Sequence, residues 1–153
     1  MAANSLRFRP ATRDDVAAIR DLVRAAYAKW VPLIGREPMP MQTDYAVAIA
    51  EHDFDLLCDV DTIVGLIETE HKPDHLWIEN VAVHPDRQGQ GLGKKLLKWA
   101  EKRAEIAGTG EIRLLTNEAM AANIKLYKKV GYKIDRTEPF RLGGTTVYMS
   151  KRI

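Results

Sequence analysis

The stretch Val81-Ala82-Val83-His84-Pro85-Asp86-Arg87-Gln88-Gly89-Gln90-Gly91-Leu92-Gly93 runs from an apolar strand through one turn into alternating glycines that open a long helix. Gly89, Gly91 and Gly93 let the backbone approach a ligand closely, because no Cβ atom stands in the way. The free N–H groups and the positive dipole end of the following helix attract anions. The stretch therefore predicts a site for a ligand that carries phosphate groups.

Two common phosphate-binding motifs do not fit these glycines. A dinucleotide fingerprint requires glycines at the first, third and sixth positions, but the sixth position counted from Gly89 is Lys94. A Walker loop requires glycine where Gln88 stands, and Ser or Thr where Lys95 stands. The spacing does fit the pattern Gln/Arg-x-x-Gly-x-Gly/Ala, beginning at Gln88.

This pattern, carried by Gln88, Gly91 and Gly93 after Val83-His84-Pro85, resembles the acetyl-CoA-binding signature of the GNAT superfamily of N-acetyltransferases. Downstream, residues 117–132 are similar to the family's Asn-x-x-Ala-x-x-Leu-Tyr-x-Lys-x-Gly-Phe/Tyr segment, and upstream Leu6–Asp15 is similar to its opening strand and helix start. The resemblance implies an acetyl-CoA-dependent N-acetyltransferase, an acyltransferase with acetyl-CoA as cosubstrate and no metal.

Hydrophobic periodicity predicts alternating strands and helices, with a capping box at Thr12 and Asp15 and a helix end at Gly108. The expected strands are Leu6–Arg9, Phe54–Cys58, Thr62–Glu70, His75–Val83, Ile112–Thr116, Tyr132–Glu138 and Thr146–Arg152. The expected helices are Arg13–Ala28, Thr43–Glu51, Leu92–Gly108 and Ala121–Val130. The segment from Ala28 to Met41 is apolar and proline-rich and is hard to read as regular structure.

The resemblance implies an α/β (α+β) fold: a mixed, mostly antiparallel central sheet with a splayed parallel strand pair, flanked by about four helices. The splayed pair is the strand ending at Val83 and the strand beginning at Ile112, and the gap between them admits the pantetheine arm of the cofactor. Residues 1–153 are expected to form a single domain.

The splay leaves backbone groups of Val81 and Val83 free to bind the pantetheine amides, as an added strand would. Alternatively, the strand that ends at Val83 is an ordinary central strand without free backbone groups. Beside the glycines, Arg87 and Lys94 could meet CoA phosphates or belong to a solvated helix face. The expected cofactor-binding residues are Val81, Ala82, Val83, Gln88, Gly89, Gln90, Gly91, Leu92, Gly93 and Asn123.

Attack of an amine on an acetyl thioester poses two proton problems. An alkyl amine with a pKa of about 10 is mostly protonated at pH 7, so a base is needed, and the leaving thiolate benefits from a proton donor. Tyr127 occupies the tyrosine of the family segment and is the candidate acid; Asn123, four residues earlier, shares its helix face. Alternatively, Tyr127 is a core aromatic residue and Asn123 is a residue of the helix start.

Glu79 is the candidate base, because strand alternation puts Trp77, Glu79, Val81 and Val83 on one face next to the splay. Glu68 on the adjacent strand is the second choice. The alternative for Glu79 is an exposed strand carboxylate without a catalytic role.

The acceptor site is the least determined part of the sequence. In the family the loop between the first two helices borders this site, so Trp30, Met41 and Tyr45 are the candidate substrate-binding residues, and Glu37 could meet an ammonium group. These residues could equally form a plug between helices or a homodimer contact. The acceptor is expected to be a small-molecule amine; a peptide or protein amine, or a non-catalytic acyl-CoA-binding sensor, is the alternative.

Composition restricts the other partners. The net charge is +2, from 23 basic and 21 acidic residues that are well mixed, so neither nucleic acid nor an anionic membrane is expected as a partner. The four histidines lack metal-ligand spacing, and the single Cys58 is expected to be an inert core thiol. Met1–Ser5 shows no signal-peptide character, so a cytoplasmic location is the default expectation.

Overall fold

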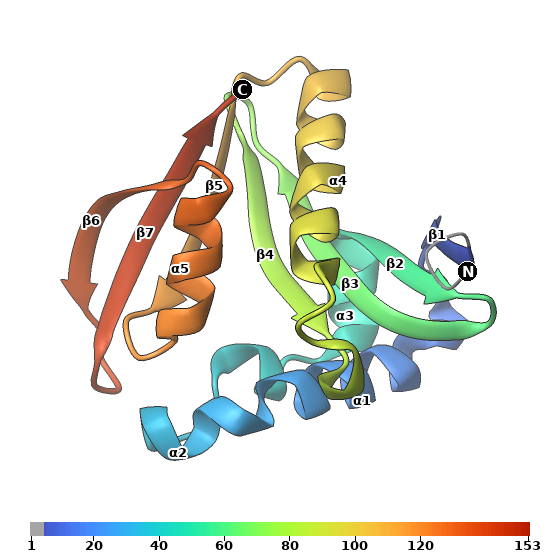
Figure 1. Cartoon of the computed structure of the whole chain (residues 1–153), viewed down its shortest axis with the longest axis horizontal. Coiled ribbons are helices and arrows are strands. Elements are labelled where there is room, and N and C mark those ends of the chain that lie inside the picture. Colours follow the sequence, from blue (N-terminus) through green and yellow to red (C-terminus); the bar gives the residue numbers. More distant parts are fainter. Residues whose placement is uncertain (1–4) are drawn as a thin grey trace.

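The computed structural model describes residues 5–153; Met1 to Asn4, on which part of the targeting expectation rests, lie outside the described residues. Within that range one sheet has the strand order β1-β2-β3-β4-β5-β7-β6 (Figure 1). Its neighbours are antiparallel except for β4 and β5, which are parallel. The strands are β1 (Leu6–Pro10), β2 (Asp53–Asp59), β3 (Thr62–His71), β4 (Leu76–Val83), β5 (Glu111–Asn117), β6 (Lys133–Pro139) and β7 (Thr145–Arg152). The mixed, mostly antiparallel sheet predicted from the sequence is thereby confirmed.

The helices are α1 (Val16–Tyr27), α2 (Val31–Ile34), α3 (Tyr45–Glu51), α4 (Leu92–Ala107) and α5 (Ala121–Lys129). The predicted helix over Arg13–Ala28 begins as a separate 3-10 turn, η2 (Arg13–Asp15). The predicted capping box there is confirmed, because the Thr12 amide donates to Asp15 Oδ2 at 2.7 Å. The segment that resisted prediction forms three short turns of helix: η3 (Ala28–Trp30), α2 and η4 (Met39–Gln42).

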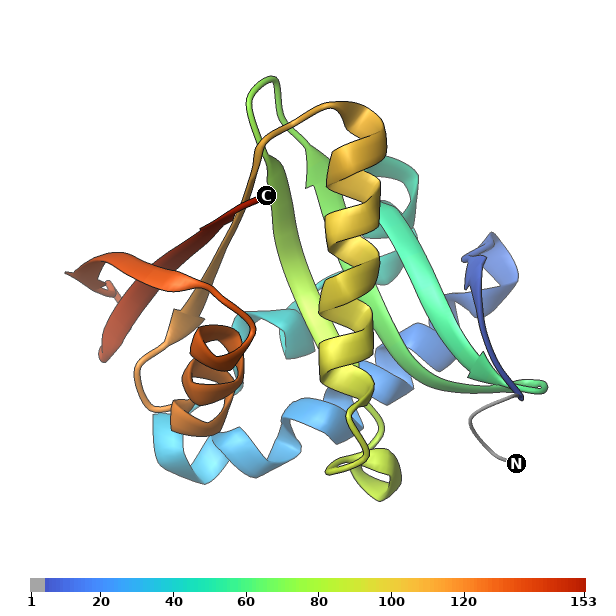
Figure 2. The ribbon, with the colours of Figure 1, turned by 45° about the horizontal axis from the view of Figure 1, so that its top comes forward.

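Helices cover both faces of the sheet, with α4 and α5 on one face and α1 and α3 on the other (Figures 1 and 2). Strand β2 therefore packs on two sides: Leu57 belongs to the cluster under α4, and Leu56 and Cys58 to the cluster under α1. Burial on both faces explains why this strand reads as a continuous apolar run rather than an alternating one. Cys58 is free and buried, as expected.

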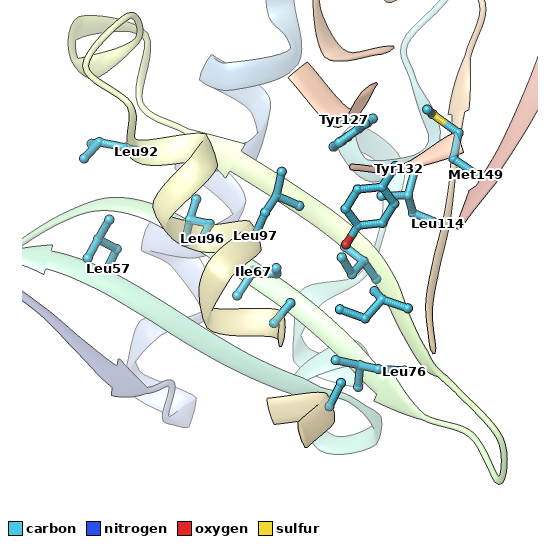
Figure 3. Packing of buried hydrophobic residues seen from close by; sticks show 14 of the residues in the cluster. Leu57, Ile67, Leu76, Leu92, Leu96, Leu97, Leu114, Tyr127, Tyr132 and Met149 are labelled. Carbon is cyan, nitrogen blue, oxygen red and sulfur yellow. The ribbon is translucent and has the colours of Figure 1, made fainter. Parts of the chain in front are cut away.

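The cluster under α4 joins the two ends of the sheet. Leu92, Leu96 and Leu97 of α4 pack over the sheet, and Tyr127 and Tyr132 extend the same cluster toward β5 and β7 (Figure 3). Helix α4 ends at Gly108, whose φ of 77° is the left-handed conformation predicted for a helix-terminating glycine. This cluster fixes α4, and with it the glycine turn that precedes the helix, against β4.

The last two strands form the expected hairpin, but β7 inserts between β5 and β6. Strand β5 is therefore paired along its whole length with β7, from Glu111↔Arg152 to Asn117↔Thr146. Strand β6 is left as an exposed edge. The sequence predicted the hairpin but not which of its strands joins the sheet.

A β-bulge interrupts β4 at Glu79. The strand pairs with β3 in register up to Ile78 and again from Asn80, so Glu79 is an extra residue. The prediction that every second residue from Trp77 to Val83 shares one face is wrong, because the extra residue changes the phase of the pleat. Val81 packs on the α4 side together with Ile78, while Ala82 belongs to the cluster under α1.

Candidate active site

Strands β4 and β5 separate after three residue pairs. Their parallel pairing runs from Leu76↔Ile112 to Ile78↔Leu114 and then stops, so within residues 5–153 the rest of β4 has no paired strand on that side. The splay implied by the family resemblance is present. Since the amide of His84 donates to Val64 O, and antiparallel bonding alternates, the polar groups of Val81 and Val83 point away from β3 into the gap.

Side chains already occupy the carbonyls on this free edge. Tyr27 Oη lies 3.3 Å from Val81 O, and Gln88 Nε2 donates to Val83 O at 3.1 Å. Gln88 Oε1 in turn accepts from Lys29 Nζ at 2.6 Å. The side chain of Gln88 thus fastens the glycine turn to the strand, and the N–H groups of the edge are left for a ligand.

The glycine turn is shaped to hold a phosphate group. Gly89 and Gly91 both have a φ of 79°, in the left-handed region that favours glycine, and a Cβ at either would meet no atom within 4 Å. Gly91 is the N-cap of α4 and supplies no side-chain cap, so the first amides of the helix remain available to an anion.

Two hollows meet at the splay, and we name them by position. The glycine groove, about 320 Å³, runs along the end of β4 and the glycine turn, and is bordered by Lys29, Arg87, Lys94 and Lys129 without any carboxylate. The inner cavity, about 170 Å³, lies between the separated strands. Tyr27, Val81, Asn123 and Tyr127 line both hollows and mark their junction.

The predicted cofactor residues fall mainly along the glycine groove. Its lining includes Val81, Ala82, Val83, Gln88, Gly89, Gly91, Leu92, Gly93 and Asn123. Gln90 is not among the lining residues, and its Oε1 accepts a hydrogen bond from Arg87 Nε at 3.0 Å. A polyanion with a thioester arm fits this arrangement, because the basic side chains and helix terminus face the groove and the unpaired strand edge continues it toward Tyr127.

Tyr127, the candidate acid, is buried at the junction. Its hydroxyl forms no hydrogen bond within residues 5–153, and burial raises its pKa to about 12, so the phenol stays protonated at neutral pH. Tyr132 lies beside it, with ring centroids 5.9 Å apart, but borders neither hollow. Asn123 lines both hollows on the preceding turn of α5.

Both candidate bases border the inner cavity, in different surroundings. Glu79 is exposed on the bulge and accepts a hydrogen bond from Trp77 Nε1 at 2.8 Å. Glu68 is buried and lies 2.7 Å from His52 Nδ1. Burial raises the pKa of Glu68, against the opposing effect of the His52 hydrogen bond.

The three candidate acceptor residues have different surroundings. Tyr45 lines the inner cavity, whereas Trp30 lines the glycine groove. Met41 is buried in the cluster under α1 and borders neither hollow, which corresponds to the plug alternative. Glu37, expected to meet an ammonium group, instead pairs with Arg24 at 2.8 Å.

Several residues of the site were missed by sequence reasoning. Tyr27 Oη donates to Asn80 Oδ1 at 2.8 Å, and Asn80 Nδ2 donates to Tyr45 Oη at 3.2 Å. This chain of hydrogen bonds forms one wall of the inner cavity. Tyr27 reads as one more apolar position of an amphipathic helix, and Asn80 turns toward α1 only because of the bulge; neither carries a local signal. Arg36 also lines the inner cavity and was missed.

Within residues 5–153, no group of three or more His, Cys, Asp and Glu side chains is arranged to hold a metal ion. Over the same range, each helix is too short or too polar to cross a bilayer.

The comparison with known families identifies the class of protein to which this fold belongs. The model of the Acetyltransferase (GNAT) family matches residues 16–132, so the chain belongs to this family. It is an acetyl-CoA-dependent acyltransferase of the N-acetyltransferase type.

Two curated relatives share parts of the sequence. The L-2,4-diaminobutyric acid acetyltransferase of Vibrio cholerae is 24% identical over 130 residues, which are 80% of this chain and 69% of that protein. The aminoalkylphosphonate N-acetyltransferase of Salmonella typhimurium is 36% identical over 78 residues, 46% of this chain and 50% of that protein.

Among solved structures, the PaiA N-acetyltransferase of Thermoplasma acidophilum in complex with coenzyme A has a TM-score of 0.85 at 20% identity, covering 97% of this chain and 99% of that one. The ribosomal-protein-S18-alanine N-acetyltransferase of Escherichia coli has a TM-score of 0.78 at 21% identity, covering 97% and 94%. At these identities the similarity concerns the fold.

Proposed function

We propose that this protein transfers the acetyl group of acetyl-CoA to a primary amine of a small molecule that enters the inner cavity. The observation that carries the proposal is the meeting of the two hollows at Tyr127 and Val81. A cofactor arm along the free edge of β4 would bring its thioester to the mouth of a cavity lined by carboxylates. The small volume, about 170 Å³, favours a small acceptor over a folded protein surface.

Bound acetyl-CoA would supply an acetyl thioester, so that a C–N bond to the amine forms as the C–S bond breaks and CoA leaves as the thiolate, which takes its proton from solvent. The cofactor residues proposed are those of the glycine groove, with the N–H groups of Val81 and Val83 and the amides at the start of α4 as donors. Gln90 would serve through its backbone only, because its side chain is hydrogen-bonded to Arg87.

In this mechanism a carboxylate takes the proton that the attacking amine must lose. We assign this role to Glu79, since it stands on the bulge where β4 leaves β5 and its exposure lets the proton pass to solvent. Glu68 is the second choice because it also borders the cavity, but its carboxylate is already hydrogen-bonded to His52.

Tyr127 assists the leaving sulfur. Its pKa of about 12 lies above that of a thiol, about 8.5 by analogy with cysteine, so its hydroxyl donates a hydrogen bond as charge develops on the sulfur rather than giving up its proton completely. A binding protein for acyl-CoA would have no need of this unpaired hydroxyl at the junction. The position of this hydroxyl at the junction therefore supports catalysis over the sensor alternative.

Both curated relatives are named for transfer to small amines, which supports the same acceptor class here. The deciding experiment is turnover of a panel of amines with acetyl-CoA, read by thiol release. Small amines should be acetylated, and peptides with a free N-terminus should react at least about tenfold more slowly. Release of thiol only with peptides would move the acceptor to the peptide class, and binding of CoA without any turnover would favour the sensor.

Homodimerisation, the single-domain organisation and a cytoplasmic location stay predictions.

A further inference from the structure

The inner cavity carries charge of both signs. Its charged lining residues are Glu68, Glu79 and Arg36. The two carboxylates stand on β3 and β4, in the centre of the sheet. Arg36 belongs to the loop after α2, and its Nη2 lies 3.4 Å from Gly143 O in the turn between β6 and β7. The carboxylates and the guanidinium therefore approach the cavity from different walls.

The end of α2 and a ring contact position Arg36 at this wall. Helix α2 ends at Gly35, whose φ of 82° and N–H bond to Val31 O at 2.8 Å turn the chain sharply before Arg36. The guanidinium then lies over the ring of Phe140, with Cζ 4.9 Å from the ring centroid. Because Phe140 also lines the cavity, the stacked guanidinium lies at the cavity wall.

The donors of Arg36 are not used up by the protein. Within residues 5–153 its guanidinium makes one hydrogen bond, a long one from Nη2 to Gly143 O at 3.4 Å, and Nε makes none. No carboxylate within residues 5–153 forms an ion pair with it, although the adjacent Glu37 pairs with Arg24 at 2.8 Å. The Nη groups of Arg36 therefore retain donors for a ligand that enters the cavity.

An oxyanion can accept hydrogen bonds from these donors, because the planar fork of a guanidinium matches a carboxylate or a phosphonate. We propose that the inner cavity selects amines that also bear a carboxylate or phosphonate, with the oxyanion held by Arg36 and the amine directed toward Glu79 and Tyr127. This substrate class rests on the proposed function. The acceptor is then zwitterionic, and its two charges face side chains of opposite sign.

The test compares acceptors that differ only in the oxyanion. β-Alanine, its neutral amide and 2-aminoethylphosphonate are assayed with acetyl-CoA on the parent protein, on Arg36→Gln and on Arg141→Gln. Arg141 is the matched control, since its guanidinium also lies over Phe140, at 5.5 Å, but does not line the cavity. The parent should prefer an acid over the amide by roughly 10- to 100-fold in kcat/KM, and the better acid identifies the oxyanion.

Arg36→Gln should remove this preference by raising KM for the acids, leaving kcat/KM for the amide within about twofold, and Arg141→Gln should behave like the parent. Thermal unfolding checks that both variants are folded. Equal turnover of acid and amide by the parent, or an unchanged preference in Arg36→Gln, overturns the inference and leaves the proposed function intact. If no amine reacts, the proposed function fails. Calorimetry of the acids with the parent and with Arg36→Gln, in the presence of CoA, then tests the oxyanion site by itself. Tighter binding to the parent supports the site, and equal or no binding overturns it.

Discussion

Tyr127 and Tyr132 are neighbouring buried phenols, yet only Tyr127 borders the two hollows. Tyr127→Phe should lower kcat by roughly 10²-fold, because it removes a hydrogen bond that forms as charge develops on sulfur, while acetyl-CoA affinity stays within about twofold. Steady-state kinetics and calorimetry measure the two quantities separately.

Tyr132→Phe is the matched control. Its hydroxyl is buried and has no hydrogen-bond partner in the described part of the chain, so removing it should leave kcat unchanged and stabilise the protein by up to about 1 kcal/mol. Turnover of Tyr127→Phe within about twofold of the parent would make Tyr127 a packing residue, and equal losses in both variants would point to disturbed packing rather than lost chemistry.

The two carboxylates of the inner cavity can be separated by their effect on pH dependence. Glu79→Gln should lower kcat/KM by roughly 10²-fold and change the acidic limb of its pH profile, since that limb reports the group that must be deprotonated to accept the proton. Glu68→Gln is measured alongside; it keeps the volume but alters the contact with His52. If the limb and rate change only in Glu68→Gln, the role of base belongs to Glu68.

At the scale of elements, the start of α4 depends on the left-handed Gly91. Alanine and tryptophan at this position both place a side chain at a φ of 79°, with about 1–2 kcal/mol of backbone strain, but only tryptophan fills the space above the turn. Gly91→Trp should weaken CoA binding by at least about 100-fold, and Gly91→Ala by far less. Calorimetry on the two folded variants decides, and equal losses would show that strain rather than bulk is responsible.

The entry into α1 is held by a carboxylate whose ionisation contributes to stability. Asp15 forms two 2.8 Å hydrogen bonds with Arg9 and accepts from the Thr12 amide, and the Arg9 contact lowers its pKa to about 2. The ionised form is favoured on folding, so this stabilisation is complete above about pH 4 and is lost as the pH falls through about 2.

Asp15→Asn should therefore lower the free energy of unfolding at neutral pH and flatten its dependence between about pH 4 and 2. Urea unfolding at several pH values measures both effects. Asp14→Asn, at the exposed neighbouring position, is the control and should retain the pH dependence of the parent. An identical slope in Asp15→Asn and the parent would assign the acid sensitivity to other groups.

Across the whole molecule, the features that the sequence predicted are those encoded within a few neighbouring residues. The glycine turn, the capping box at Thr12 and the end of α4 at Gly108 each follow from local conformational preferences, and the structure contains all three. The family resemblance supplied the splay of β4 and β5. The insertion of β7 and the bulge at Glu79 depend on pairing between distant strands, which periodicity does not encode.

The inner cavity, too, depends on contacts between distant residues that the local sequence does not encode. Tyr27 reaches it from α1, Arg36 from the loop after α2 and Tyr127 from α5, so their meeting is a product of the tertiary fold. Trp30 was assigned to the wall of the acceptor site from its place in a proline-rich loop, but it borders the glycine groove. The family resemblance indicates which loop borders the acceptor site, without indicating which of its side chains turns inward.

The seam, meaning the short run of pairs that joins β4 to β5, affects how readily the sheet opens locally. Three residue pairs join these strands, against seven between β5 and β7, so the sheet is weakest at its centre. Amide hydrogens of Val81 and Val83 should exchange with solvent deuterium much faster than those of the β5–β7 ladder. A ligand that bridges the seam should slow exchange at these two amides more than elsewhere, because it restores the missing hydrogen bonds. Exchange mass spectrometry with and without CoA measures this, and uniform protection along the chain would mean that the ligand stabilises the molecule as a whole without closing the seam.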